Sequence, residues 1–292
     1  MSKLKVIDGG LFTTIQDSGR AGYRKFGVPI SGAMDMQSFK NANKLVGNKE
    51  DDPVIEFTLK GGVYKFDSDA VIAITGALMN PNLNDNEFEM NSSIEVRKGD
   101  ILKIGFAEKG CRAYLAIQGE WELDEEMGSY STYELGKFGG LDGSKLKAGD
   151  EISWKNTDTD FLKRTLPKDE IPYYSSKLTV EFITGPEWEW LTVENQLQFL
   201  NTSFKVSSKS NRMGIRLETE EPILTQKAGM RSSGVISGVI QLPPNGSPII
   251  LMKDGQTVGG YPRIGTIPEI YLGRIAQLPP NGIVRFIQRK EL

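Results

Sequence analysis

Short apolar runs separated by turn residues recur along the whole chain, and this spacing most constrains its fold. Glycine (32 residues) and proline (14 residues) are spread between the runs. Turns such as Lys98-Gly99-Asp100 and Ala148-Gly149-Asp150 lead directly into the next run. Short strands at this spacing are typical of a β-sandwich or β-barrel and not of alternating βαβ units, so we predict an all-β fold. The clearest predicted strands are 71–74, 101–104, 114–117, 178–182, 248–251 and 283–286.

Few segments have the pattern of a helix. Asp35 is a favourable N-cap for a helix over 36–46, and Gly47 supplies the stop. Pro186 can begin a short helix that runs to residue 198, and the apolar spacing over 267–275 predicts a third.

The 292-residue length allows two domains. The pentapeptide Leu-Pro-Pro-Asn-Gly occurs at 242–246 and again at 278–282, which indicates either two similar hairpin turns or a trace of internal duplication. The polar stretch 156–168 is the best linker candidate. We therefore expect an N-terminal β module over 1–165, including the 36–46 helix, and a C-terminal β module over 170–292.

Composition excludes several classes of function. The net charge of −3 favours neither nucleic acid nor an anionic membrane as a partner, and no apolar run approaches the roughly 18 residues of a membrane helix. The chain has no histidine and one cysteine, so a Ser-His-Asp triad, a Cys-His pair and a His-ligated zinc site are all impossible. We expect no metal site. The N-terminus has no signal-peptide pattern and a disulfide cannot form within the chain, so we expect a cytoplasmic protein.

The segment 253–265 carries the richest mixture of polar groups and glycine. Asp254, Gln256, Thr257 and Tyr261 offer acid, base and hydrogen-bonding groups, as an amide or carboxylate ligand requires. The alternative is a long polar hairpin loop. Without histidine, the general base must be an Asp, Glu, Lys, Tyr or Cys side chain, and Asp254 is the first candidate.

A second polar segment lies between residues 210 and 217. Asn211, Arg212 and Arg216 can bind a carboxylate or phosphate, because arginine presents a planar fork of donors. The alternative is a solvated turn with ordinary salt bridges.

Other polar residues favour a structural interpretation. Gln16, Asp17 and Arg20 are expected to form a network that holds the N-terminal strand, and Cys111 is expected to be a small buried side chain.

The chain has neither a Gly-rich phosphate loop with Lys-Ser/Thr nor a Gly-x-Gly-x-x-Gly motif, so it shows no sign of binding ATP itself. The biotinyl-lysine pattern Ala-Met-Lys is also missing, which indicates that the chain is not a biotin carrier.

Five motifs in order resemble the allophanate hydrolase subunit 2 family, which includes biotin-dependent carboxyltransferase domains. The resemblance runs from about residue 8 to residue 288. Its motifs are Thr13-Thr-Ile-Gln-Asp-x-Gly-Arg20, Gly27-Val-Pro-x-Ser-Gly-Ala-Met-Asp35, Asn43-x-Leu-Val-Gly-Asn48, Ser210-Asn-Arg-Met-Gly-x-Arg-Leu217 and Asp254-x-Gln-Thr-x-Gly-Gly-Tyr-Pro-x-Ile-Gly265.

This resemblance implies a cyclophilin-like β-barrel architecture with two related modules. It also implies a subunit of an ATP-dependent 5-oxoprolinase complex, which opens the lactam 5-oxoproline to glutamate together with partner subunits A and B. In that complex ATP acts at the level of the whole assembly. Two alternatives stay open: biotin-dependent carboxyl transfer to urea or a similar amide, and non-catalytic antagonism of a Kip-like kinase inhibitor.

The 254–261 segment resembles the stand-alone oxoprolinase type more than the urea carboxylase type. Val258 and Ser233 depart from the usual stand-alone pattern, since a second Thr and a carboxylate are common there. The interpretation assigns catalysis to Asp254 and Tyr261 and places Asn211 and Arg212 against the substrate carboxylate. The full set of predicted substrate-binding residues is Asn211, Arg212, Gln241, Gln256 and Thr257.

Overall fold

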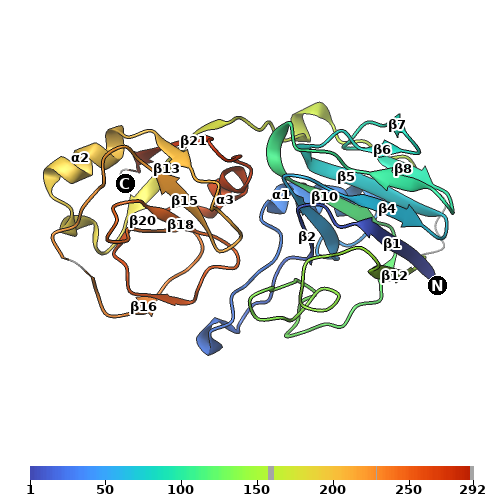
Figure 1. Cartoon of the computed structure of the whole chain (residues 1–292), viewed down its shortest axis with the longest axis horizontal. Coiled ribbons are helices and arrows are strands. Elements are labelled where there is room, and N and C mark those ends of the chain that lie inside the picture. The colour runs from blue at the N-terminus through green and yellow to red at the C-terminus, as the bar shows by residue number, and fades with distance from the viewer. Residues whose placement is uncertain (157–160, 228, 290–292) are drawn as a thin grey trace. The chain divides into compact units, whose positions relative to one another are not determined.

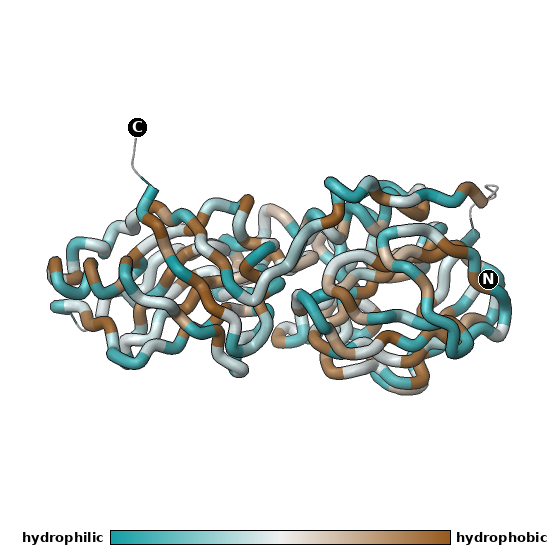
Figure 2. The backbone as a smooth tube through the Cα atoms, turned by 90° about the horizontal axis from the view of Figure 1, so that it is seen from above, coloured by the Kyte–Doolittle hydropathy of each residue, from teal (hydrophilic) through white to brown (hydrophobic). Residues whose placement is uncertain are grey.

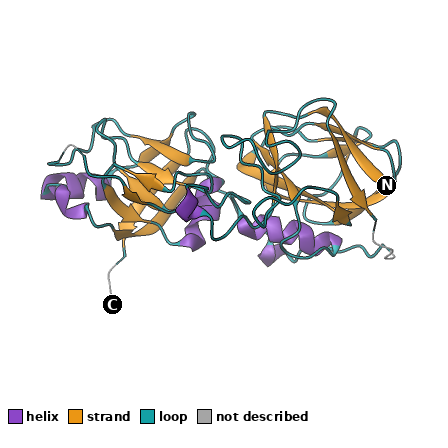
Figure 3. Cartoon of the chain, turned by 90° about the horizontal axis from the view of Figure 1, so that it is seen from below, coloured by secondary structure: helices purple, strands orange, loops and turns teal. Residues whose placement is uncertain are grey.

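The computed structural model describes residues 1–156, 161–227 and 229–289, and strands make up most of it (Figure 1, Figure 3). The all-β fold class is therefore confirmed, with three short α-helices in the described part of the chain. The residues form two compact units. The first comprises Met1–Ala21 and Ser31–Tyr174, and the second comprises Gly22–Ile30 and Ser175–Leu292.

The predicted domain boundary lies between residues 165 and 170, whereas the two units meet in the chain at Tyr174 and Ser175. The segment Gly22–Ile30 also belongs to the second unit. Within that unit, the Arg24 guanidinium donates a hydrogen bond to the carbonyl oxygen of Val235. The local sequence of this segment contains no signal of such a long-range contact. Residues 157–160 of the expected linker lie outside the described residues.

The first unit contains two sheets. One has seven strands in the order β11-β12-β1-β4-β9-β6-β7, and the other has five in the order β2-β3-β10-β5-β8. The strands are β1 (Ser2–Asp8), β2 (Phe12–Gln16), β3 (Val54–Thr58), β4 (Val63–Phe66), β5 (Ala70–Leu78), β6 (Asn82–Leu83), β7 (Asn86–Glu87), β8 (Ser93–Val96), β9 (Ile101–Lys103), β10 (Lys109–Ile117), β11 (Glu120–Trp121) and β12 (Glu151–Lys155).

The core of the first unit comes from alternate residues of these strands. Leu4 and Val6 of β1 are buried while their neighbours Lys5 and Ile7 are exposed, as a half-buried strand requires. Figure 2 shows hydrophobic and hydrophilic stretches following one another along the chain. The predicted strands 71–74 and 114–117 are instead continuous apolar runs, because β5 and β10 are buried on both faces.

Helix α1 (Met36–Val46) has the predicted bounds. The Asp35 carboxylate accepts a hydrogen bond from the Ser38 backbone N–H at 3.3 Å, and Gly47 ends the helix at φ 80°. The helix packs against β5 and β10 (Figure 1). The predicted structural network is also present, because the buried Asp17 carboxylate accepts hydrogen bonds from Gly19 and from the 129–131 loop.

The second unit is a closed barrel with the strand order β13-β20-β17-β18-β15-β14-β21. Its strands are β13 (Lys177–Thr184), β14 (Phe204–Val206), β15 (Gly214–Glu218), β17 (Val239–Gln241), β18 (Ile249–Leu251), β20 (Arg263–Thr266) and β21 (Ile283–Gln288). A separate two-stranded ribbon pairs β16 (Ser233–Gly234) with β19 (Val258–Gly259).

Aromatic rings fill much of the barrel core. Phe199 stacks on Phe286 with ring centroids 4.9 Å apart, and Phe182, Phe204 and Trp188 pack around them. Burying such rings stabilises the barrel. The side chains on the outer face of the barrel are then available for other roles.

The helices of the second unit agree in part with the prediction. Helix α3 (Glu269–Ala276) ends one residue after the expected helical segment 267–275. The helix expected to run to residue 198 is instead a 3-10 turn, η3 (Trp188–Trp190), followed by α2 (Val193–Asn201). Two further 3-10 turns are η1 (Arg24–Phe26) and η2 (Lys168–Glu170). No described helix is long and apolar enough to cross a membrane.

Candidate functional site

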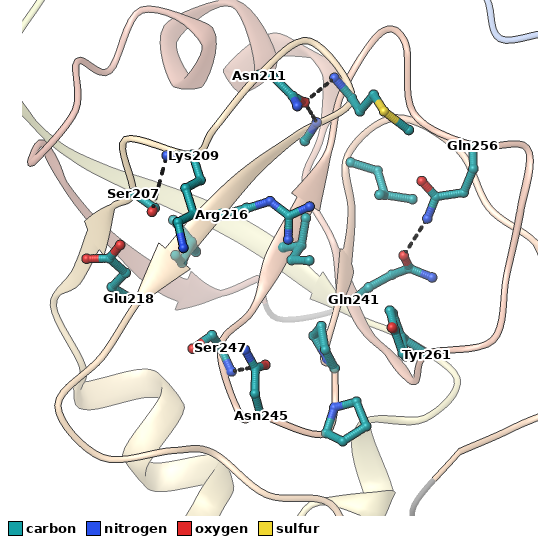
Figure 4. A pocket seen from close by; sticks show the side chains of 17 residues that line it. Ser207, Lys209, Asn211, Arg216, Glu218, Gln241, Asn245, Ser247, Gln256 and Tyr261 are labelled. Carbon is teal, nitrogen blue, oxygen red and sulfur yellow. Dashed lines mark hydrogen bonds between the residues drawn. The ribbon is translucent and has the colours of Figure 1, made fainter. Parts of the chain in front are cut away.

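A pocket of about 590 Å³ lies against the outer face of the second unit's barrel (Figure 4). Strands β15, β17 and β18 form its floor, and its rim comes from the 207–213 turn, the β17–β18 hairpin and the 256–261 loop. A volume of this size is typical of a small-molecule site. Four of the predicted site residues line it: Asn211, Gln241, Gln256 and Tyr261.

Strand register brings the polar floor together. Arg216 of β15 pairs with Ile249 of β18, Ile249 pairs with Gln241 of β17, and Gln241 pairs with Arg263 of β20. Residues directly opposite in a sheet point to the same face, so these four side chains form one row. The row carries two cations and one amide.

The Gln241 side chain is 1% exposed, although it lies on the outer face. Its Oε1 accepts a hydrogen bond of 2.9 Å from Gln256 Nε2. Its Nε2 is buried and has no hydrogen-bond partner among the residues that the structure describes. The two amide groups therefore present donors and acceptors beside the pocket.

Lys209 and Arg216 supply the positive charge of the pocket, and both side chains are drawn facing it in Figure 4. Within the described part of the second unit, the ion pairs are Arg212–Asp254 and Arg263–Glu187, and neither pocket cation takes part in them. Glu218 is the acidic residue of the pocket lining. Two cations without an acidic partner make the pocket suitable for an anionic group.

Arg212 and Asp254 contact each other. Arg212 Nε donates to Asp254 Oδ2 at 2.8 Å, and Arg212 Nη2 donates to Asp254 Oδ1 at 3.0 Å. Their side chains are only 5% and 10% exposed. The predictions made Arg212 a substrate-carboxylate ligand and Asp254 an acid/base group, but the arginine fork faces the protein's own carboxylate. Neither residue lines the pocket.

The backbone extends this connection. Asp254 N donates to Arg212 O at 2.9 Å, and Met252 N donates to Met213 O at 3.0 Å. The ion pair thus joins the turn that carries Lys209 to the loop that carries Gln256. Its position indicates that it holds two walls of the pocket in place.

The other predicted residues have different surroundings. Asn211 Oδ1 accepts hydrogen bonds from Met213 N and Gly214 N, which orders the turn before β15. Tyr261 is 43% exposed at the rim. Thr257 lies outside the pocket lining, and its carbonyl oxygen accepts a hydrogen bond from Val235 N.

Arg263 is the last residue of the row, at the end opposite Arg216. It forms two hydrogen bonds, of 2.9 and 2.8 Å, with the buried Glu187 carboxylate, and these lower the pKa of Glu187 and raise that of Arg263. The charge of Arg263 is therefore balanced within the protein. No group of three or more Asp, Glu, Cys or His residues able to hold a metal ion occurs in the described ranges.

Sequence reasoning gave Lys209 no role and named Arg216 only as a general anion ligand. The available signal was the alternation of residues 214–218, which places Arg216 on the face opposite the buried Ile215 and Leu217.

Comparison with known proteins identifies the family. The family model "Carboxyltransferase domain, subdomain A and B" matches residues 26–288. The C subunit of 5-oxoprolinase from Escherichia coli (strain K12) is 36% identical over 285 residues, which cover 98% of this chain and 91% of that protein.

Larger proteins contain a similar part. Urea amidolyase of Lachancea kluyveri is 34% identical over 97% of this chain, which spans only 17% of that protein. The crystal structure of Kluyveromyces lactis urea carboxylase matches 99% of this chain and 27% of that chain, with a TM-score of 0.92 and 32% identity. Because the family model and a 36%-identical relative both extend over most of its length, the chain belongs to the carboxyltransferase domain family of subdomains A and B.

Proposed function

We propose that this chain is the lactam-binding subunit of an ATP-dependent 5-oxoprolinase complex, and that the outer-barrel pocket holds 5-oxoproline. The similarity to the C subunit of Escherichia coli 5-oxoprolinase supports the complex, because it covers 91% of that protein. The proposal includes partner subunits A and B and a cytoplasmic location.

The pocket lining is the observation that carries the proposal. The substrate is a five-membered lactam with one carboxylate, so its site needs cationic and amide-binding groups together. Arg216 and Lys209 are suited to the carboxylate, and Gln241 and Gln256 are suited to the lactam amide. Tyr261 at the rim offers a phenolic hydroxyl to the bound lactam.

In this proposal the chain contributes binding and orientation. Rigid strands hold Arg216 and Gln241, and a substrate fixed at both its carboxylate and its amide has few remaining orientations. Asp254 and Arg212 keep the two pocket walls together through their ion pair. ATP is held by a partner subunit, since this chain has no phosphate-binding motif.

Reconstitution tests the proposal. Subunits A and B with this chain are expected to release glutamate from 5-oxoproline only when ATP is present, and omission of this chain is expected to abolish the release. An unchanged rate without this chain would contradict the proposal.

Arg216→Gln is the corresponding variant in the pocket. Loss of a charge-assisted hydrogen bond, about 1.5–3 kcal/mol, is expected to raise KM for 5-oxoproline roughly 10- to 150-fold. The matched control is Arg285→Gln, which removes an exposed arginine of β21 outside this pocket. An equal KM in both variants would exclude Arg216 as the carboxylate ligand.

Biotin-dependent carboxyl transfer to urea is the second candidate function. The family description and the match to Kluyveromyces lactis urea carboxylase favour it. Gln241 and Gln256 suit a neutral amide equally well, whereas the cations Lys209 and Arg216 have no counterpart to bind in urea. Bicarbonate exchange that depends on a separate biotin carrier and is abolished by avidin would support this second function; exchange insensitive to avidin would count against it.

A further inference from the structure

Two buried polar atoms of the second unit lack a hydrogen-bond partner among the described residues: Gln241 Nε2 and Ser233 Oγ. Buried donors are seldom left unpaired in folded proteins, because they lose their bonds to water without replacement. Two such atoms in one region are available to bond to a group from outside the chain.

The ribbon of β16 and β19 brings these two atoms to the same space. Ser233 lies directly opposite Gly259 in the antiparallel register, so its side chain points to the face on which a Gly259 side chain would stand. A Cβ atom at Gly259 would collide with Gln241 Nε2. The Ser233 hydroxyl and the Gln241 amide therefore lie on the same face of the ribbon, and the amide lies against Gly259, which has no side chain to displace it.

The surrounding contacts hold the two donors in place. Gln256 holds the Gln241 side chain through Oε1, which leaves the Nε2 hydrogens as the free part of the amide. Val235 N donates to Thr257 O at 3.0 Å, which anchors the ribbon beyond its paired residues. Both donors are thus held before any ligand arrives.

The two donors suit an uncharged acceptor. A serine hydroxyl and an amide N–H both donate to a carbonyl oxygen, which has two lone pairs. The nearest cation of the strand row, Arg263, is already paired with Glu187. An anionic group is better bound by Arg216, on the other side of Gln241 in that row, and by Lys209, which lines the pocket.

We infer that Ser233 Oγ and Gln241 Nε2 form a subsite for the carbonyl oxygen of a small amide, and that the absence of a side chain at Gly259 lets the Gln241 amide take its position there. The amide class of the ligand rests on the proposed function. The subsite places the carbonyl group of the ligand under the ribbon and its remaining polar groups toward the pocket.

The test compares two glycines of one ribbon. Gly259→Ala places a methyl group against Gln241 Nε2, whereas Gly234→Ala places it in open space, and neither glycine has the positive φ that disfavours alanine. The probe is 2-pyrrolidinone, a lactam without a carboxylate, titrated into the isolated full chain and followed by NMR of the Gln241 side-chain NH₂.

We expect the probe to shift the Gln241 NH₂ signals, Gly259→Ala to weaken binding at least about tenfold, and Gly234→Ala to change it less than about twofold. Ser233→Ala is expected to weaken binding about tenfold and Ser233→Thr, which keeps the hydroxyl, to retain it. Arg216→Gln should leave 2-pyrrolidinone binding unchanged while weakening that of 5-oxoproline.

Equal binding by the Gly259→Ala, Gly234→Ala and Ser233→Ala variants would overturn the inference. So would a persistent water contact to Gln241 NH₂ at saturating probe, since a water molecule alone would then satisfy this donor. The titration uses neither partner subunits nor ATP. If the reconstituted complex is inactive but the two glycine variants still differ in their binding of the probe, the proposed function is refuted and the subsite is not.

Discussion

Asp254→Asn provides the sharpest test of the ion pair beside the pocket. The substitution keeps the size of the side chain but removes the carboxylate charge that faces the Arg212 guanidinium, which is 5% exposed. Removing one partner of a buried, bidentate pair costs about 3–5 kcal/mol. Because asparagine still accepts one hydrogen bond, we expect a loss of about 3 kcal/mol in the unfolding free energy of the second unit, or roughly 10 °C in Tm.

The measurement is guanidinium chloride denaturation followed by tryptophan fluorescence, with a separate transition fitted to each unit. The matched control is Asp69→Asn, which breaks the Arg97–Asp69 pair of 2.9 Å in the first unit, where the side chains are 63% and 57% exposed. An exposed pair contributes at most about 1 kcal/mol. If Asp254→Asn costs no more than this control, the pair does not hold the pocket walls.

The same variant separates a structural role from a catalytic one. If Asp254 were the general base, its replacement would lower kcat, leave KM unchanged and remove the acidic limb of the pH–rate profile. If it holds the walls, KM should rise and the pH profile should keep its shape. A stable Asp254→Asn protein that lacks only kcat would refute our interpretation.

Three further outcomes are expected. Arg263 lowers the pKa of Glu187, so their pair stabilises the folded protein above the ordinary carboxyl pKa of 4.5. This stabilisation is lost as the pH falls below that value, so the Glu187→Gln variant should lose less unfolding free energy on acidification than the unsubstituted protein. Asp35→Ala should lower unfolding free energy by about 2 kcal/mol in denaturant melts, because Ser38 N and two hydroxyl groups lose their acceptor. Burial raises the pKa of the Cys111 thiol, so a thiol reagent at neutral pH should react far faster with unfolded than with native protein.

Local signals explain why parts of the fold were predictable. Helix α1 follows from one capping side chain, Asp35, and one stop residue, Gly47, and both act within a single turn of their targets. The helix predicted after Pro186 begins late because Leu191 pairs with Thr225 instead, and Thr192 then caps α2 by accepting a hydrogen bond from Asn195 N. That pairing joins residues distant in sequence, which no local pattern indicates.

The candidate site was predictable in some of its residues but not in its contacts. The polar segment 253–265 does border a pocket, through Gln256 and Tyr261. Side-chain chemistry alone could not show that Arg212 contacts Asp254, because an arginine suits a protein carboxylate and a substrate carboxylate equally well. The long-range strand register decides which carboxylate the arginine contacts.

The register of β15 connects the ion pair to the chemistry of the pocket. Ile215 faces inward opposite Ile250, and Arg216 faces outward opposite Ile249, so a slip of one residue would bury the charge and expose Leu217. The Arg212–Asp254 pair lies just before this strand and ties it to the turn after β18 through the bond from Asp254 N to Arg212 O. A pair that does not line the pocket therefore supports the register that places Arg216 on the outer face. For this reason, breaking it should weaken binding of the anionic lactam more than binding of 2-pyrrolidinone, and equal weakening of both would show that the pair acts on the ribbon instead.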